Sequence, residues 1–305
     1  MGSIKNKKIL ILGGTGFLGN KLISSLLNEN LQIYLLARNS RTRKDLQKYN
    51  SNKNIKIFDW IRTDSKIIEK ILKEVNCVIN LCGILYENRT GDFDRVHSEL
   101  PSLLGELCLK NNIETFVHVS ALGVSEFSDS KYSRSKAIGD KRLLENFPKA
   151  KILRPSLLFG KGDNFFGQFS KMSSISPALP LISKNTRFQP IFVDDVVLAI
   201  IKLLSKKDIK GNIFEIGGKF VYTFEELLKI LLDIKNIKRL LIPLSPNLMI
   251  FPAFFLQLLP KPPFTVDQMK LLRKDNILNG KYPGLEALDI KATSMKKELT
   301  KIYKN

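Results

Sequence analysis

Cysteine and histidine are scarce in this sequence: its 305 residues include only three cysteines and two histidines. Cys77, Cys82 and Cys108 have none of the spacings typical of a zinc site or a redox pair, and such a sparse, odd count suits a reducing compartment. No cluster of ligand residues surrounds His97 or His118 in the sequence. The sequence therefore predicts no metal site, and we expect the cysteines to be small apolar residues of the core.

Long apolar runs are also missing. A helix that spans a bilayer needs roughly 18–20 apolar residues, whereas the longest candidate, residues 248–259, is shorter and contains Pro252 and Gln257. The first residues lead straight into an apolar strand, without the cleavage site of a secretory signal or an Arg- and Ser-rich import leader. We therefore expect a soluble chain that is at most peripheral to a membrane.

Acidic residues are few beside basic ones: 29 Asp and Glu face 49 Lys and Arg, which gives a net charge of +20. Such a charge suits a nucleic acid, an anionic membrane surface or an acidic protein. The basic residues are spread along the chain, and no zinc-finger spacing or RNP-type aromatic motif accompanies them. Nucleic-acid binding is therefore the least favoured of the three.

The N-terminal half alternates between apolar strands and helical patterns. Residues 8–12 read as a buried strand, a glycine-rich turn and a helical pattern follow, and residues 32–36 read as a second strand. The alternation continues to about residue 153, which predicts an α/β fold with a Rossmann-type doubly wound parallel sheet. We expect residues 1–165 to form the NAD(P)-binding domain, joined by a late strand near 212–218. Residues 166–305 are expected to form a smaller C-terminal α/β lobe for a substrate or partner.

The strongest motif is Gly13-x-x-Gly16-x-x-Gly19, which lies between the first strand and the first helix. The first glycine permits the tight turn, the second lets the backbone approach a pyrophosphate, and the third allows close packing of helix on strand. The helix N-terminus then stabilises the anion. We therefore expect a dinucleotide to be bound here by the three glycines together with Thr15, Phe17 and Leu18.

The end of the second strand favours NADPH over NADH. An NAD site has an acid there to bind the ribose hydroxyls, but this chain has Ala37 followed by Arg38. Arg38 suits the 2′-phosphate of NADPH, and Arg41 and Arg43 are candidates to assist it. NAD(H) is the alternative, in which case these arginines form a solvated basic loop.

Two further strands end in candidate nucleotide contacts. Asp59 follows the third strand and suits the adenine amino group, and the segment from Asn80 to Gly83 follows the fourth strand. The carboxyl ends of parallel strands meet at one edge of the sheet, where ligands of such folds bind. We therefore expect Asp59 at the adenine, and Asn80 and Gly83 along the ribose side.

Tyr132-x-x-x-Lys136 is the candidate catalytic pair. On a helix the two side chains lie one turn apart on the same face. A lysine ammonium in this position lowers the pKa of the tyrosine and binds the nicotinamide ribose, while the tyrosine moves a proton. The motif is weak alone, but its position after a fifth parallel strand makes a contact with the nucleotide the favoured interpretation.

Together these residues resemble the short-chain dehydrogenase/reductase superfamily in its extended and atypical branches, over nearly the whole chain. Arg154-Pro155 resembles the segment that ends the sixth strand in those proteins, so Pro155 is expected near the nucleotide. The stretch 259–276, with its Lys-Pro-Pro-Phe-Thr and Arg-Lys-Asp-Asn sequences, is similar to the family of the complex I alpha subcomplex subunit nine and its bacterial relatives.

The resemblance implies an NADPH-binding accessory or assembly subunit at respiratory complex I or near ubiquinone metabolism, with a nucleotide that is structural. Bacterial cytoplasm, with peripheral attachment to the inner membrane, is the expected setting, and the mitochondrial matrix side is the alternative. One departure concerns catalysis: the Ser or Thr that active extended members place after the fifth strand corresponds to Ala121, or at best to Ser120. An active reductase, epimerase or dehydratase that uses Tyr132 and Lys136 is the alternative function.

The apolar stretch 248–259 is the candidate docking surface. Ile250, Phe251, Phe254, Phe255 and Leu258 recur at roughly helical spacing beside a basic stretch. One interpretation is contact with a membrane interface or a hydrophobic partner groove. The other is that these residues form the core of the smaller lobe.

Overall fold

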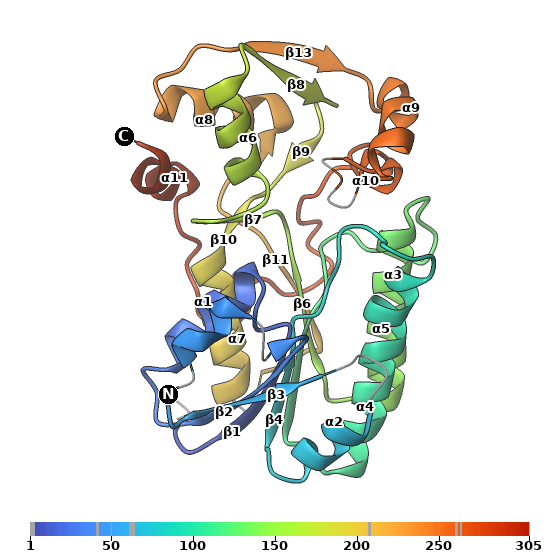
Figure 1. Ribbon diagram of the computed structural model, residues 1–305, viewed down its shortest axis with the longest axis vertical. Helices are drawn as coiled ribbons and strands as arrows, with labels where there is room; N and C mark the ends of the chain where they lie inside the picture. Colours follow the sequence, from blue (N-terminus) through green and yellow to red (C-terminus); the bar gives the residue numbers. More distant parts are fainter. Residues whose placement is uncertain are drawn as a thin grey trace.

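The computed structural model describes residues 4–40, 43–49, 51–60, 65–206, 209–259, 262 and 264–304. The molecule has two stacked parts, a large parallel sheet covered by helices on both faces and a smaller lobe above its carboxyl edge (Figure 1). Within the described residues no helix is long and apolar enough to cross a membrane.

The large sheet is the doubly wound parallel sheet that the sequence predicts. Its seven strands among the described residues run parallel in the order β11-β6-β5-β4-β1-β2-β3. The chain starts at the centre, moves outward to β3 and then returns to the other side of β1, so the strand order reverses between β1 and β4. Ligands of such sheets bind in the crevice at this reversal. The strands are β1 (Lys8–Leu12), β2 (Gln32–Ala37), β3 (Ile55–Asp59), β4 (Cys77–Asn80), β5 (Thr115–Val119), β6 (Lys151–Pro155) and β11 (Ile213–Ile216).

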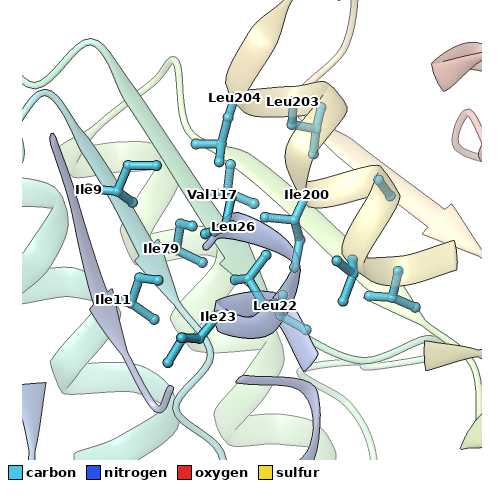
Figure 2. Packing of buried hydrophobic residues seen from close by; sticks show 14 of the residues in the cluster. Ile9, Ile11, Leu22, Ile23, Leu26, Ile79, Val117, Ile200, Leu203 and Leu204 are labelled. Atoms are coloured by element: carbon cyan, nitrogen blue, oxygen red, sulfur yellow. The ribbon is translucent and has the colours of Figure 1, made fainter. Parts of the chain in front are cut away.

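Alternating side chains of the buried strands make a core on each face of the sheet. Ile9 and Ile11 of β1 pack with helices α1 (Phe17–Leu26) and α7 (Val193–Ser205) (Figure 2). Leu10 and Leu12 face the opposite core, which contains α2 (Ser65–Leu72), α4 (Leu100–Lys110) and α5 (Lys131–Asn146). A strand that is apolar on both faces is typical of a parallel sheet covered by helices.

The smaller lobe has a core rich in phenylalanine, in which Phe166, Phe169 and Phe224 contact one another or the ring of Phe165. Its helices are α6 (Phe166–Ile175), α8 (Phe224–Ile234), α9 (Pro246–Leu256), α10 (Val266–Leu271) and α11 (Met295–Tyr303). Its strands pair as β8 (Ala178–Ile182) with β13 (Leu240–Leu244) and β9 (Arg187–Phe188) with β12 (Tyr222–Thr223), while β7 (Leu158–Phe159) pairs with β10 (Ile191–Phe192). Short helical segments are η2 (Lys44–Tyr49), α3 (Asp92–Asp94), η3 (Arg95–Glu99) and η4 (Leu285–Leu288).

The second half of the chain contributes more to the large sheet than one late strand. β11 pairs with β6, as expected for residues near 212–218. In addition, α7 and η4 pack into the same core as β1. Elements from both sides of residue 165 therefore build the large sheet and its covering helices. The division of the chain into domains at that residue stays a prediction.

Candidate functional site

The glycine turn after β1 leaves bare backbone at the reversal of the sheet. Gly13 has a φ of +77°, and a Cβ on it would lie 2.7 Å from the carbonyl carbon of Leu81. A Cβ on Gly19 would lie 2.5 Å from Cα of Gly14, so only glycine lets α1 approach the turn this closely. Gly16 is the N-cap of α1 and no side chain of the described residues caps that end. The turn therefore fits a pyrophosphate, which accepts hydrogen bonds from helix N-terminal amides.

Basic side chains lie beside this turn at the end of β2. Arg43 donates from Nη1 to the hydroxyl of Thr15 at 3.0 Å, and its Nε and Nη2 donate to Asp45 at 2.9 and 2.6 Å. Arg38 is exposed just after β2, and Arg41 lies outside the described residues. The structure thus brings Arg43, rather than Arg38, into direct contact with the glycine turn.

Two other candidate nucleotide contacts, Asp59 and Asn80, have partners inside the protein. Asp59 is level with Ala37 on the neighbouring strand and accepts the backbone amide of Ser40 at 2.9 Å. Asn80 is fully buried, and its Oδ1 accepts the amide of Cys82 at 3.0 Å. Asn80 thus shapes the loop that packs on Gly13. These contacts give both residues a structural role at the edge of the site.

Three further candidate nucleotide contacts are Phe17, Leu18 and Pro155, which have packing or backbone roles along the same edge of the sheet. A Cβ on Gly160 would lie 3.2 Å from Cζ of Phe17, so this ring reaches from α1 to the chain after β7. Leu18 packs against the core under α1. The carbonyl of Pro155 accepts the amide of Leu122 at 2.9 Å and anchors the loop after β5.

Tyr132 and Lys136 lie one turn apart near the start of α5. The Lys136 side chain is 3% exposed, and Nζ donates to the carbonyl of Val119 at the end of β5, at 3.2 Å. A Cβ on Gly83 would lie 3.6 Å from this Nζ, an ordinary contact distance, so the amine lies beside the loop after β4. Burial lowers the pKa of Lys136 to about 8, and the nearby carboxylate of Asp140 acts in the opposite direction.

The pKa of Tyr132 contradicts one expectation. Burial raises it to about 12, and the charges of Asp140 and Asp267 add to the increase. The net shift is therefore upward, opposite to the lowering that we expected beside Lys136, because loss of solvation around the phenol dominates. A proton donor works best with a pKa near the operating pH, so burial moves Tyr132 away from that range.

The ring of Tyr132 packs edge-on against two other rings. Its centroid lies 5.9 Å from that of Phe93 and 5.2 Å from that of His97. Nε2 of His97 accepts the amide of Ile84 at 3.1 Å, so the proton is on Nδ1, which lies 3.0 Å from the Ser135 hydroxyl. The sequence predicts a structural role for His97. In the structure its ring bonds both to the loop after β4 and to α5, and so links the two.

Residues 9–217, which include the glycine turn and the Tyr132–Lys136 pair, match the NAD dependent epimerase/dehydratase family. The chain belongs to that family. It is 30% identical to NADH dehydrogenase (ubiquinone) 1 alpha subcomplex subunit 9, mitochondrial, of Dictyostelium discoideum, over 96% of this chain and 83% of the relative. It is also 30% identical to the mouse protein of the same name, over 96% of this chain and 78% of the relative. The expected resemblance of the chain to the subunit nine family is thereby confirmed.

Solved structures of other proteins share the fold. The UDP-glucose 4-epimerase of Thermotoga maritima, solved with UDP-glucose, is 18% identical and superposes with a TM-score of 0.72 over 97% of both chains. The expected extended short-chain dehydrogenase/reductase architecture is confirmed by this likeness, which concerns the fold alone.

Below the Tyr132–Lys136 pair, this family member has a buried ionic cluster that the sequence did not reveal. Asp140, the next residue along the same face of α5, accepts Nε of Arg154 at 2.8 Å, and Nη1 of Arg154 lies 3.7 Å from Glu215. Nε2 of His118 lies 3.7 Å from Asp140, and burial holds the pKa of His118 well below its usual range. Ser120 is also buried, and its hydroxyl acts on Asp140: burial raises the pKa of this carboxyl, while Arg154 and Ser120 work in the opposite direction.

A π-helical turn supports α5 from behind. η3 is this turn, and a Cβ on Gly139 of α5 would lie 1.7 Å from the carbonyl oxygen of His97. π-helical turns frequently occur at functional sites. Only glycine at position 139 lets α5 lie against the turn, and nothing in the sequence pattern marked this glycine.

Beside the start of α5, a cavity of about 620 Å³ lies between the two parts of the molecule. Its walls include Phe93 and Lys131 from the larger part, and Phe254, Leu258 and Asp267 from the smaller lobe. Phe93 also contacts the ring of Tyr132. The cavity therefore joins the candidate site to α9.

Proposed function

We propose that this chain is an NADPH-binding accessory subunit of respiratory complex I, or of an assembly linked to ubiquinone metabolism, with little or no turnover of the nucleotide. One observation carries the proposal. The glycine turn leaves the bare backbone that a pyrophosphate needs. The names of the relatives support a place in complex I, and the raised pKa of Tyr132, the expected proton donor, supports a nucleotide that is held rather than used.

NADPH is the proposed nucleotide, with NAD(H) as the alternative. Ala37 offers no carboxylate to the ribose hydroxyls, and Arg43 lies 3.0 Å from Thr15 in the glycine turn. Arg43→Ala should raise the dissociation constant of NADPH about tenfold and leave that of NADH nearly unchanged. Lys44→Ala, which removes the neighbouring exposed positive charge at the start of η2, serves as the control. Equal losses for both nucleotides would refute this selectivity.

The principal test uses protein purified from its own host. The bound nucleotide is released by denaturation, identified by mass, and followed when candidate quinones are added to the intact protein. We expect NADPH at about one molecule per chain that dissociates slowly and is not consumed. Consumption of NADPH with a quinone or another substrate would replace this proposal with the enzymatic one.

A working reductase, epimerase or dehydratase is the second candidate, and one observation favours it. The cavity of about 620 Å³ adjoins Phe93, which packs on Tyr132, so a substrate has space near the site. A bound NADPH supplies hydride chemistry to such an enzyme. Lys136 would hold the ribose, and Tyr132 would hold or move a proton at its hydroxyl.

We propose α9 as the surface that meets a membrane. Along α9 only Ala253 is buried, while Leu248, Phe251, Phe254 and Phe255 are each more than half exposed. The alternative that α9 forms the core of the smaller lobe is therefore wrong for these side chains. The cavity beside Phe254 is lined by three basic residues and two acidic ones, so a small excess of positive charge lies at the site of the apolar helix and suits an anionic lipid surface. These residues are Arg89, Lys131, Lys270, Glu87 and Asp267.

Sedimentation with vesicles that contain anionic lipid tests this surface. Phe251→Asp together with Phe255→Asp should abolish binding, because two charges would have to enter the interface. Phe127→Asp is the matched control, since Phe127 is 94% exposed elsewhere on the molecule. A folded double variant that still sediments with the vesicles would exclude α9 as the contact.

The setting follows from the partner. The relatives carry mitochondrial names, which supports the matrix side of the inner membrane. The bacterial cytoplasm with peripheral attachment stays a prediction from the sequence. Fractionation of the native host, with the protein followed by antibody alongside a complex I subunit, distinguishes the two settings.

A further inference from the structure

A carboxylate from the smaller lobe completes the N-terminus of α5. Asp267 of α10 accepts the backbone amide of Lys131 at 2.7 Å and that of Tyr132 at 3.1 Å. It also accepts the hydroxyl of Ser130, the N-cap residue, at 2.7 Å, and Ser130 in turn accepts the amide of Ser133 at 3.2 Å. The first four amides of a helix have no partner within it. Here Asp267 accepts two of them, and the hydroxyls of Ser128 and Ser130 accept the other two.

Asp267 is itself held firmly. Thr265 and Gln268 form a reciprocal capping box at the start of α10. Lys270, one turn further on, donates to the carbonyl of Asp129, just before α5, at 3.3 Å. The two helices α9 and α10 pack side by side above α5 (Figure 1). The carboxylate therefore belongs to a helix that is bonded to the segment before α5, although it is more than a hundred residues from α5 in the sequence.

The first turn of α5 carries one of the two side chains of the candidate pair. Tyr132 is the second residue of the helix, and Lys136 follows one turn later. A negative charge at a helix N-terminus stabilises the helix through its dipole, and the effect is confined to the first turn. Loss of this charge would loosen the backbone of Tyr132, and with it the packing of its ring on Phe93 and His97.

We infer that Asp267 is a positioning residue for nucleotide binding: it fixes the start of α5 so that Tyr132 and Lys136 face the nicotinamide ribose. The inference rests on the proposed function, in which the crevice between β1 and β4 takes NADPH. It adds that the smaller lobe, through one carboxylate, sets the affinity of a site that lies on the larger part.

Asp275 offers a matched control. Its carboxylate also lies in the C-terminal part of the chain and accepts three hydrogen bonds, from the backbone amide, Nε and Nη2 of Arg187, at 2.8, 2.9 and 2.7 Å. These bonds hold two segments of the smaller lobe together and make no contact with α5. If the carboxylate of Asp267 acts only by stabilising the fold, its loss should therefore affect NADPH binding in the same way as the loss of the Asp275 carboxylate.

The experiment compares NADPH dissociation constants of the unmodified full chain, Asp267→Ala, Asp267→Asn and Asp275→Ala, together with their melting temperatures. Amide hydrogen exchange across residues 130–136 is followed in the same proteins. We expect Asp267→Ala to bind NADPH about tenfold more weakly, which corresponds to about 1.4 kcal/mol, with faster exchange in the first turn. Asp267→Asn, which keeps one acceptor oxygen, should lie between, and Asp275→Ala should bind as the unmodified chain does.

The outcomes separate the inference from the proposed function. Binding by both Asp267 variants within twofold of the unmodified chain would overturn the inference and leave the proposed function standing. An equal loss in Asp275→Ala would also overturn it, because any carboxylate of the lobe would then have the same effect. Should Asp267→Ala not fold, Asp267→Asn carries the comparison. Failure of the unmodified chain itself to bind NADPH would refute the proposed function and the inference together.

Discussion

Replacing Lys136 by Met should make the folded protein more stable and a poorer nucleotide binder. Burial lowers the pKa of Lys136 from 10.5 to about 8. One pKa unit corresponds to about 1.4 kcal/mol, so the charged amine destabilises the folded state by about 3 kcal/mol at pH 7. Methionine has a similar length and no charge, but it leaves the carbonyl of Val119 without its donor, at a cost of about 1 kcal/mol. The net gain in free energy of unfolding is about 2 kcal/mol.

The pH dependence distinguishes this cause from simple repacking. Between pH 8 and 10.5 the unfolded lysine is still protonated while the folded one is not, so the unmodified protein gains stability as the pH rises. The advantage of Lys136→Met is therefore complete below about pH 8 and disappears towards pH 10.5. Urea unfolding from pH 7 to pH 10 measures both proteins, with Lys141→Met, exposed on the same helix, as control. A variant that is less stable at pH 7, or an advantage independent of pH, would refute the reasoning.

Three further predictions concern the same site. Gly19→Ala should weaken NADPH binding at least tenfold in calorimetry, because its methyl group would lie 2.5 Å from Cα of Gly14 and displace the turn; binding within twofold would show that the turn is not the pyrophosphate site. Gly139→Ala should lower the free energy of unfolding by about 2–3 kcal/mol in urea, since α5 must move off the π-helical turn at His97; an unchanged midpoint would contradict the close contact. NADPH affinity should fall as the pH rises through about 8, because Lys136 loses the charge that attracts the ribose and phosphates. In Lys136→Gln the affinity should be lower and independent of pH in this range. A pH dependence that persists in this variant would point to another group.

The sequence predicted the nucleotide-binding part well because its signals are local. A continuous apolar run marks β1 as a strand buried on both faces, and the glycine spacing after it marks a turn at which side chains are excluded. The i,i+4 spacing of Tyr132 and Lys136 likewise sufficed to place both near the start of one helix. In each case the physical constraint acts within about ten residues, so the sequence pattern contains it.

What the sequence did not predict depends on contacts between distant segments. Asp140 follows Lys136 by one turn, yet only the arrival of Arg154 from β6 and Glu215 from β11 makes it part of a buried cluster. Asp267 caps a helix that begins at residue 131, and no spacing reveals that contact. Periodicity shows that α9 is apolar, but it does not show whether other elements cover the helix. The raised pKa of Tyr132 was missed for the same reason, since it reflects burial.

The pairing of β11 with β6 has a consequence for how the chain is made. Until residues 213–216 leave the ribosome, β6 is an edge strand with unpaired backbone groups, and the face of the sheet that α7 covers is exposed. Such edges recruit other chains. A fragment that ends near residue 165 should therefore aggregate rather than fold, and a nascent chain of that length needs protection during synthesis.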